Sequence, residues 1–137
     1  MKRATREWVR KAEADYRLAE AIAHGSEPFH DQLCFHAQQS AEKYLKALLE
    51  ELGQPVPKLH DLDQLALRLL PFHPTLSSLQ RGFSKLTDFA VDTRYPGCSA
   101  TKRQAVSALR WAGRIRHDCR TLLGLRPPRP RSSKLSS

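Results

Sequence analysis

The feature that most constrains the fold of this chain is an amphipathic segment at residues 31–52, DQLCFHAQQSAEKYLKALLEEL. An α-helix turns about 100° per residue, so side chains three or four positions apart lie on the same face. Apolar side chains recur at that spacing along the whole segment, which predicts a long helix with one buried stripe. Glu42 and Lys46, four residues apart, are placed to form an ion pair on this helix. The predicted stripe consists of Leu33, Ala37, Ala41, Tyr44, Leu45, Leu48 and Leu52.

The rest of the chain shows helical periodicity in four further segments, separated by glycine and proline. They span about residues 5–24, 62–69, 75–91 and 101–123. We expect Thr5 to cap the first of them and His60 or Asp61 to cap the second. Gly82, inside the segment 75–91, predicts a bend or a close contact with another helix. No strand-like alternation is long enough to predict a sheet, so we expect an all-α, up-and-down bundle of four to five helices in one domain, residues 1–125.

Basic residues outnumber acidic ones, with 23 Lys and Arg against 14 Asp and Glu and a formal net charge of +9. A basic balance favours a polyanionic partner such as RNA, or an acidic protein, although many basic surfaces are only solvated. Residues 126–137 contain no acid and lack apolar periodicity, and their basic residues are Arg126, Arg129, Arg131 and Lys134. We therefore expect a disordered basic tail after the domain.

Cysteine and histidine usage argues against a disulfide framework and against a metal site. The three cysteines, Cys34, Cys98 and Cys119, show no CxxC spacing, and the six histidines are scattered without ligand spacing. The N-terminus MKRATREW has no apolar core of a secretion signal, and no apolar run approaches the roughly 20 residues of a membrane span. We expect a cytoplasmic protein without metal, cofactor or membrane association.

Four stretches of the sequence resemble one known family. They are WVRKAEADYRLAEAI at 8–22, FHAQQSAEKYLKALLEELG at 35–53, LHDL at 59–62 and TDFAVDTRYP at 87–96. In this order they are similar to HEPN domains (higher eukaryotes and prokaryotes nucleotide-binding). The resemblance implies a helical fold. Many stand-alone bacterial and archaeal members are paired with a minimal nucleotidyltransferase as toxin and antitoxin, so the resemblance also implies the toxin-like half of such a pair, acting on RNA.

A candidate catalytic pair lies in the last helical segment. HEPN ribonucleases carry an arginine and a histidine with four to six residues between them, and Arg110 and His117, with six between them, resemble this pair at its longest spacing. Seven positions amount to about 700° of rotation, so the two side chains share a helix face. Histidine can move a proton near neutral pH and arginine can neutralise a phosphate, while the 2′-hydroxyl attacks without a metal. The alternative is that they belong, with Arg103 and Arg114, to a solvated basic face.

The turn that follows the segment 75–91 contains a second candidate site. Arg94 would hold a phosphate there, and Tyr95 would stack on a base. In the alternative, Arg94 bonds a helix end or a carboxylate such as Asp88, and Tyr95 packs into the bundle.

The polar face of residues 31–52 provides a third candidate site, completed by His60 at the start of the next helix. Lys43 and Lys46 would contact phosphates, and Gln39, with His36 beside it, would read a base edge. The alternative is a network between helices, in which His36 or Gln39 satisfies backbone groups near His60.

Three functions therefore remain open. The first is a HEPN protein that acts on RNA, the second is a noncatalytic module that binds a nucleotide or docks onto a partner enzyme, and the third is a helical interaction protein without a ligand. Phe35 and Leu49 form a second apolar strip on residues 31–52. This strip predicts a surface at which two copies meet as a homodimer.

Overall fold

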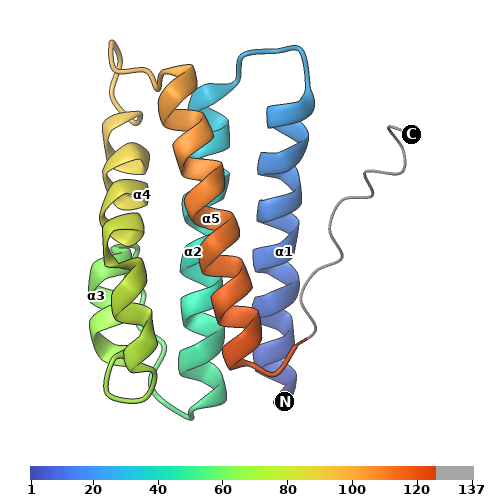
Figure 1. Ribbon diagram of the computed structural model, residues 1–137, viewed down its shortest axis with the longest axis vertical. Coiled ribbons are helices and arrows are strands. Elements are labelled where there is room, and N and C mark those ends of the chain that lie inside the picture. Colours follow the sequence, from blue (N-terminus) through green and yellow to red (C-terminus); the bar gives the residue numbers. More distant parts are fainter. Residues whose placement is uncertain (126–137) are drawn as a thin grey trace.

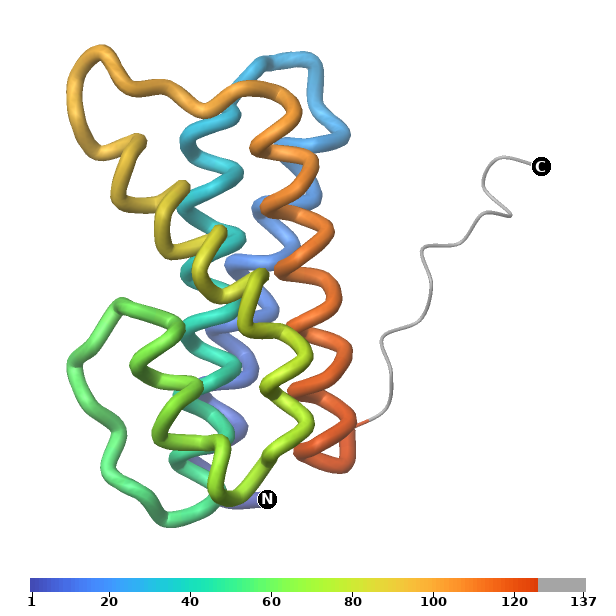
Figure 2. The backbone as a smooth tube through the Cα atoms, turned by 60° about the vertical axis from the view of Figure 1, so that its left-hand side comes forward, coloured from blue at the N-terminus to red at the C-terminus, as the bar shows by residue number. Residues whose placement is uncertain are grey.

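The computed structural model describes residues 1–125, and the predicted tail, 126–137, lies outside them. Residues 1–125 form five α-helices and one 3₁₀-helix and contain no strand (Figure 1). Both Figure 1 and Figure 2 place α5 alongside α2, and the prediction of an all-α, up-and-down bundle is confirmed. The elements are α1 (Arg3–His24), α2 (His30–Glu51), α3 (Leu62–Leu69), η1 (Pro74–Leu79), α4 (Gln80–Asp92) and α5 (Lys102–Leu122).

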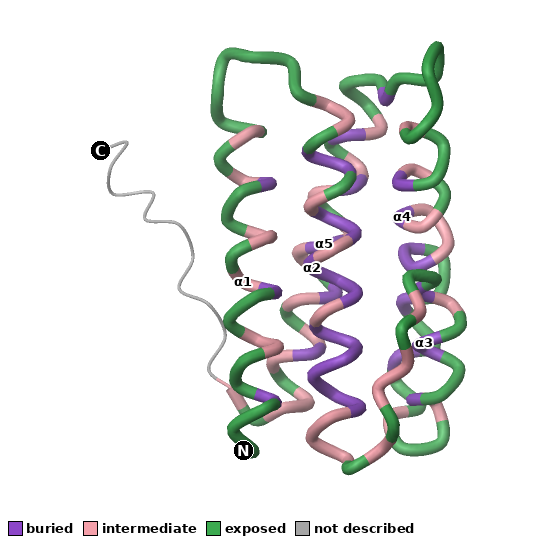
Figure 3. The backbone as a smooth tube through the Cα atoms, turned by 180° about the vertical axis from the view of Figure 1, so that it is seen from behind, coloured by how far each residue is buried: buried purple, intermediate pink, exposed green. Residues whose placement is uncertain are grey.

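Helix α2 lies at the centre of the bundle and contacts α1, α3, α4 and α5. Figure 3 shows buried residues following one another along α2, whereas buried residues on α1 are isolated points. The predicted apolar stripe is buried from Leu33 to Leu48, and Leu52 is half-buried. Because neighbours surround α2, burial also reaches polar residues outside the stripe, namely Gln38, Ser40, Glu42 and Lys46.

The second apolar strip predicted on this helix does not form. Leu49 is 1% exposed and belongs to the core, whereas Phe35 is 42% exposed. The Phe35 ring lies edge-on to the ring of His36, with 5.2 Å between ring centres. Helix α2 has neighbours on several sides, so a residue away from the main stripe is covered as well. The predicted homodimer therefore loses this strip as its basis.

Helix α1 begins before Thr5 and packs on α2 through small side chains. The helix starts at Arg3 with Lys2 at the N-cap, so the prediction that Thr5 is the cap is wrong. Thr5 is instead fully buried, and its hydroxyl donates to Glu51 Oε1 at 2.9 Å. The other buried residues of α1 are Ala12 and Ala19, whose short side chains allow a close approach to the neighbouring helix.

Local sequence signals set the beginning of α3 and of α4. Asp61 caps α3 as expected, accepting from the backbone N–H groups of Asp63 at 2.9 Å and Gln64 at 3.2 Å. The predicted helix 75–91 is divided into the 3₁₀-helix η1 and the α-helix α4. Pro74 stands at the start of η1, where its missing N–H costs no hydrogen bond.

Gly82 allows α4 to approach α5 closely. A Cβ at this position would lie 2.6 Å from Trp111 Cδ2 and nearer still to Cε3. No other residue fits at that separation unless a helix or the indole ring shifts. The predicted close contact at Gly82 is therefore confirmed.

Helix α5 starts at a capping box and is tied to the start of α2. Thr101 Oγ1 accepts from the backbone N–H of Gln104 at 3.1 Å, and Gln104 Oε1 accepts from that of Thr101 at 2.9 Å. Asp31 of α2 accepts from the backbone N–H of Ala100 at 2.6 Å. These bonds fix where α5 begins, and its buried face consists of Ala105, Ala108, Ala112, Ile115 and Cys119.

Candidate functional site

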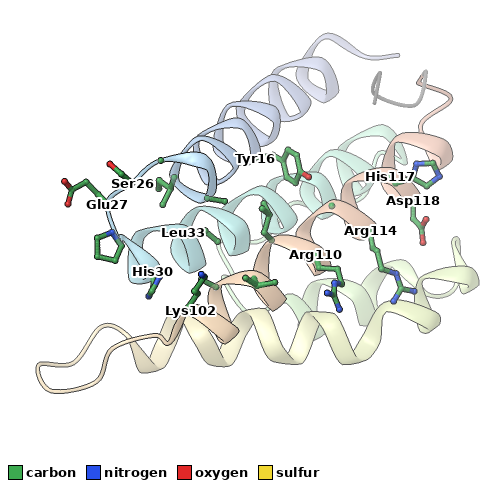
Figure 4. Close-up of a pocket in the computed structure, with 18 residues that line it drawn as sticks. Tyr16, Ser26, Glu27, His30, Leu33, Lys102, Arg110, Arg114, His117 and Asp118 are labelled. Atoms are coloured by element: carbon green, nitrogen blue, oxygen red, sulfur yellow. The ribbon is translucent and has the colours of Figure 1, made fainter. Parts of the chain in front are cut away.

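A groove of about 890 Å³ lies between α1 and α5 and extends to the loop that joins α1 to α2 (Figure 4). Residues from both helices and from this loop line it, together with Leu33 at the beginning of α2. Much of the lining is apolar, so the groove offers a surface on which a flat ring can pack. The apolar side chains include Tyr16, Ile22, Leu33, Ala105, Val106 and Leu109.

Basic side chains from α5 line the same groove. Figure 4 shows them spread along the helix as Lys102, Arg110, Arg114 and His117. Within residues 1–125, the side chains of Lys102, Arg110 and His117 have no hydrogen-bond or ion-pair partner. The guanidinium of Arg114 lies 4.7 Å from the ring centre of Trp111 and has no carboxylate partner in the same part of the chain. These side chains can therefore contact an anion without first giving up an ion pair.

The predicted catalytic pair, Arg110 and His117, lies in this groove, and both residues are exposed. Their shared helix face is the one predicted from the spacing. Seven residues at 1.5 Å per residue separate the two Cα positions by about 10 Å along α5. A base and a cation that act on one phosphate must both lie within hydrogen-bond reach of it. The catalytic role of the pair remains a prediction.

Two further arginines of α5 turn inward and share one carboxylate of α1. Arg116 Nε and Nη2 donate to the two carboxylate oxygens of Glu13 on α1, at 2.6 and 2.8 Å. Arg120 Nη1 lies 3.6 Å from Glu13 Oε1, and the Tyr44 hydroxyl donates to the same oxygen. Arg116 and Arg120 therefore face α1, whereas Lys102, Arg110, Arg114 and His117 line the groove.

In the Glu13 cluster, burial and ion pairing act on the pKa values in opposite directions. Burial works to raise the pKa of Glu13, but hydrogen bonds from Arg116 and Tyr44 and the nearby guanidinium charges hold it below its ordinary value. Burial works to lower the pKa of Arg116, and the hydrogen bond and charge of Glu13 raise it overall. Burial, together with the hydrogen bond to Glu13, raises the pKa of Tyr44. Glu13 is therefore ionised and Arg116 protonated at neutral pH.

The polar face of α2 is occupied by contacts with α1. His36 Nδ1 lies 2.9 Å from Asp15 Oδ1, and Lys43 Nζ donates to Asp15 Oδ2. These bonds join α2 to α1 across the bundle. Lys43 and His36 would have to give up Asp15 before binding a phosphate, so their assignment to a nucleotide site remains a prediction.

A second polar network joins α2 to the start of α3. Gln38 donates to the backbone oxygen of His60 at 2.8 Å, so the bond expected from His36 or Gln39 is made by a neighbouring residue. Gln39 instead donates to Gln38 Oε1, also at 2.8 Å. The only available sequence signal for Gln38 was its place four residues before Glu42, because i, i+4 side chains are neighbours on a helix.

Glu42 is the centre of this network and is 3% exposed. Its carboxylate lies 3.0 Å from Lys46 Nζ and 3.0 Å from His60 Nδ1, so the ion pair predicted for Glu42 and Lys46 is confirmed. Lys46 is 5% exposed and lies 5.7 Å from the ring centre of Trp8. Lys46 would have to leave this buried ion pair before it could contact a phosphate, so its phosphate-binding role remains a prediction.

Arg94 and Tyr95 lie in the loop between α4 and α5 and do not line the groove. Tyr95 is 64% exposed, so the alternative in which it packs into the bundle is wrong. The side chain of Arg94 is exposed and has no hydrogen-bond or ion-pair partner among residues 1–125, Asp88 included. The structure therefore separates the Arg94 loop from the Arg110 groove, and the binding role of the loop remains a prediction.

Residues 1–125 contain no group of three or more His, Cys, Asp or Glu side chains that could hold a metal ion. No helix in this part of the chain is long and apolar enough to cross a membrane.

Comparison with known proteins gives one family and two similar structures. The family model described as HEPN domain matches residues 5–122. The crystal structure of TT1696 from Thermus thermophilus has a TM-score of 0.75 and 27% identity, over 88% of this chain and 98% of that one. The structure of ST0689, an archaeal HEPN homologue, has a TM-score of 0.70 and 24% identity, over 90% of this chain and 99% of that one, and shows a common fold. No curated protein matches the sequence.

Proposed function

Because the chain belongs to the HEPN domain family, we propose that it acts on RNA in the groove between α1 and α5. One observation carries this proposal: Lys102, Arg110, Arg114 and His117 line the groove with no carboxylate partner among residues 1–125. RNA presents a row of phosphates, and such a row matches cations spread along one helix. By the same family resemblance, the protein would be the toxin-like half of a pair with a minimal nucleotidyltransferase.

The chemistry we propose is cleavage of the RNA backbone by transfer to the 2′-oxygen. A base removes the 2′-hydroxyl proton, the 2′-oxygen attacks the adjacent phosphorus, and the 5′-oxygen leaves with a proton. His117 would take or return the proton, because an imidazole changes charge near neutral pH. Arg110 would neutralise the charge that develops on the phosphate oxygens.

The Cα atoms of Arg110 and His117 are separated by about 10 Å along α5. This separation suggests that one site takes its arginine and its histidine from two different chains. Two copies related by a two-fold axis, with their α5 helices antiparallel, would bring Arg110 of one copy beside His117 of the other. HEPN domains are commonly dimeric, which supports this arrangement. We therefore propose a homodimer in which the two grooves face each other.

A second candidate function is a noncatalytic module that binds a nucleotide or docks onto the partner enzyme. The exposed Tyr95 beside Arg94 favours it, since an aromatic ring and a free guanidinium are suited to a base and a phosphate. Lys43, Gln39, His36 and His60 are already bonded within the chain and contribute less to this candidate.

The test is cleavage of a labelled RNA in the presence of a chelator. Wild-type protein should cleave, and Arg110→Ala and His117→Ala should each abolish cleavage without loss of helical content, because exposed side chains contribute little to stability. Arg68→Ala removes an exposed arginine of α3 outside the groove and should cleave as wild type does. Light scattering should give twice the 15.6 kDa chain mass.

Two results would count against cleavage: a wild-type protein that cuts no RNA, or a His117→Ala variant that cuts as fast as wild type. Retained nucleotide binding that is lost in Arg94→Ala would then support the noncatalytic module. Co-purification with a minimal nucleotidyltransferase encoded in the neighbouring reading frame would test the proposed partner.

A further inference from the structure

The two walls of the groove are joined by an ion-pair cluster beside His117. Arg116 and Arg120 of α5 both form ion pairs with Glu13 of α1. Arg116 meets Glu13 with both arms of its guanidinium, at 2.6 and 2.8 Å. The same guanidinium lies 4.4 Å from the ring centre of Tyr16, a residue that lines the groove. Glu13, Arg116 and Tyr16 therefore form a bridge from one wall to the other.

The geometry of this bridge is restrictive. A forked arginine–carboxylate pair fixes the relative orientation of both planes as well as their distance. The side chains of Glu13 and Arg116 are only 16% and 15% exposed, so water weakens the pair less than it would weaken a surface pair. Arg120, one turn further along α5, also lies close to Glu13, at 3.6 Å. Two points one turn apart on α5 are thus anchored to a single carboxylate of α1, which limits rotation of α5 about its axis.

His117 follows Arg116 directly and precedes Arg120 on the same helix. Because successive side chains are turned by about 100°, an inward Arg116 determines the direction of His117. Gly113 belongs to the same arrangement, since a Cβ there would lie 3.1 Å from the Tyr16 hydroxyl. The bridge and the close approach of Gly113 to Tyr16 therefore lie on the stretch of α5 that carries His117, the proposed base.

We propose that Glu13 and Arg116 are positioning residues, which hold His117 in the groove at the orientation that cleavage requires. This inference rests on the proposed function for its catalytic part. Its structural part, the fixed direction of residue 117, stands without RNA. Lys102, Arg110 and Arg114 form no hydrogen bond or ion pair with the described residues of the bridge, so they keep their ability to bind phosphates when it is broken.

The catalytic test compares kcat and KM for Glu13→Gln, which keeps the size of the side chain and removes its charge. Misplacement of a reacting group by about 1 Å can cost on the order of 100-fold in rate, so kcat should fall by about 10- to 100-fold. KM should stay close to the wild-type value, because the phosphate contacts remain. Arg116→Lys, which keeps the charge but loses the fork, should give the same change in kcat.

The matched control is Glu42→Gln, which removes a buried carboxylate that also forms an ion pair but does not line the groove. It should lower the melting temperature while leaving kcat unchanged at a temperature at which the protein is folded. A fall in kcat for Glu42→Gln as large as that for Glu13→Gln would reduce the effect to general loss of stability and overturn the positioning role.

The RNA-independent test measures the distance between spin labels at His117→Cys and Arg17→Cys, in a Cys98→Ser background diluted with unlabelled protein. We expect a narrow distance distribution, which broadens or shifts in Glu13→Gln and does not change in Glu42→Gln. An equally narrow, unshifted distribution in Glu13→Gln would overturn the inference, and so would broadening without a fall in kcat. If the distribution broadens but wild-type protein cuts no RNA, the proposed function fails and the fixed direction of residue 117 is upheld.

Discussion

Replacement of Gly82 by alanine tests the packing that holds α4 against α5. The new Cβ would lie 2.6 Å from Trp111 Cδ2 and 2.9 Å from Cζ3, with Cε3 nearer still. Carbon atoms in contact prefer about 3.5–4.0 Å, so the two groups must separate by about 1 Å or more. The indole ring can do so only by moving away from α4, and it also stacks on Arg114, whose guanidinium lies 4.7 Å from the ring centre.

Two opposing contributions determine how much Gly82→Ala changes the free energy of unfolding. Overpacking in a tight contact costs about 1–3 kcal/mol. Alanine in a helix interior gains about 1 kcal/mol over glycine. Because the contact involves several atoms of a rigid ring, we place the steric cost near the upper end of its range, at about 3 kcal/mol. The free energy of unfolding should therefore fall by about 2 kcal/mol, and the melting temperature by about 5–10 °C for a domain of this size.

Urea denaturation followed by far-UV circular dichroism measures this change in the free energy of unfolding. The matched experiment repeats Gly82→Ala in a Trp111→Leu background, where the ring is absent and only the helix-propensity gain remains. There the substitution should stabilise, by up to about 1 kcal/mol. If Gly82→Ala is as stable as wild type, or destabilises equally in both backgrounds, the close contact does not exist as described.

Three further predictions follow from buried or titratable groups. The lowered pKa of Glu13 means that its stabilisation is complete above its ordinary value of 4.5 and is lost as pH falls through the lower, folded-state pKa. The stability difference between wild type and Glu13→Gln, from urea midpoints, should therefore shrink on acidification below about pH 4.5, and a constant difference would contradict this. Glu42→Gln should lower the free energy of unfolding by about 3 kcal/mol, because it leaves the buried Lys46 without its counter-charge. A change in the free energy of unfolding within experimental error would show that the Glu42–Lys46 pair is hydrated. The exposed Cys98 should react fast with a thiol reagent, whereas the buried Cys34 and Cys119 should react only on unfolding. Burial raises the pKa of Cys34 to about 11 and also raises that of Cys119, so neither forms the reactive thiolate in the folded protein. Fast labelling of more than one thiol per chain would refute this.

Local patterns in the sequence were sufficient for the helices and several of their ends. The apolar spacing of residues 31–52 reflects the helical turn itself, so the stripe from Leu33 to Leu48 is found buried as predicted. Asp61 and Thr101 lie at helix starts because their side-chain oxygens accept from N–H groups two or three residues away. These signals act within a few residues and need no knowledge of the neighbours.

The extent of burial could not be predicted in the same way. Periodicity gives the direction of the buried stripe but not its width, which depends on how many elements surround a helix. Helix α2 is enclosed by four other helices, so Leu49 and the Glu42–Lys46 pair are buried although a two-sided amphipathic pattern would leave them at the surface. Thr5 likewise does not cap α1 as expected. Its hydroxyl instead donates to Glu51, the last residue of α2, which is far away along the chain.

The candidate site could likewise be predicted from the sequence only in part. Periodicity and spacing were enough to predict that α5 is a helix with many basic residues and that Arg110 and His117 share one of its faces. They could not predict which of those basic residues are free, because a charge is neutralised by whatever lies opposite it in space. Packing of the helices brings Glu13 of α1 against Arg116 and Arg120 and leaves Arg110, Arg114 and His117 along the groove without a carboxylate partner among residues 1–125. An ion pair forms over a few ångströms of space, and that distance is unrelated to separation along the chain.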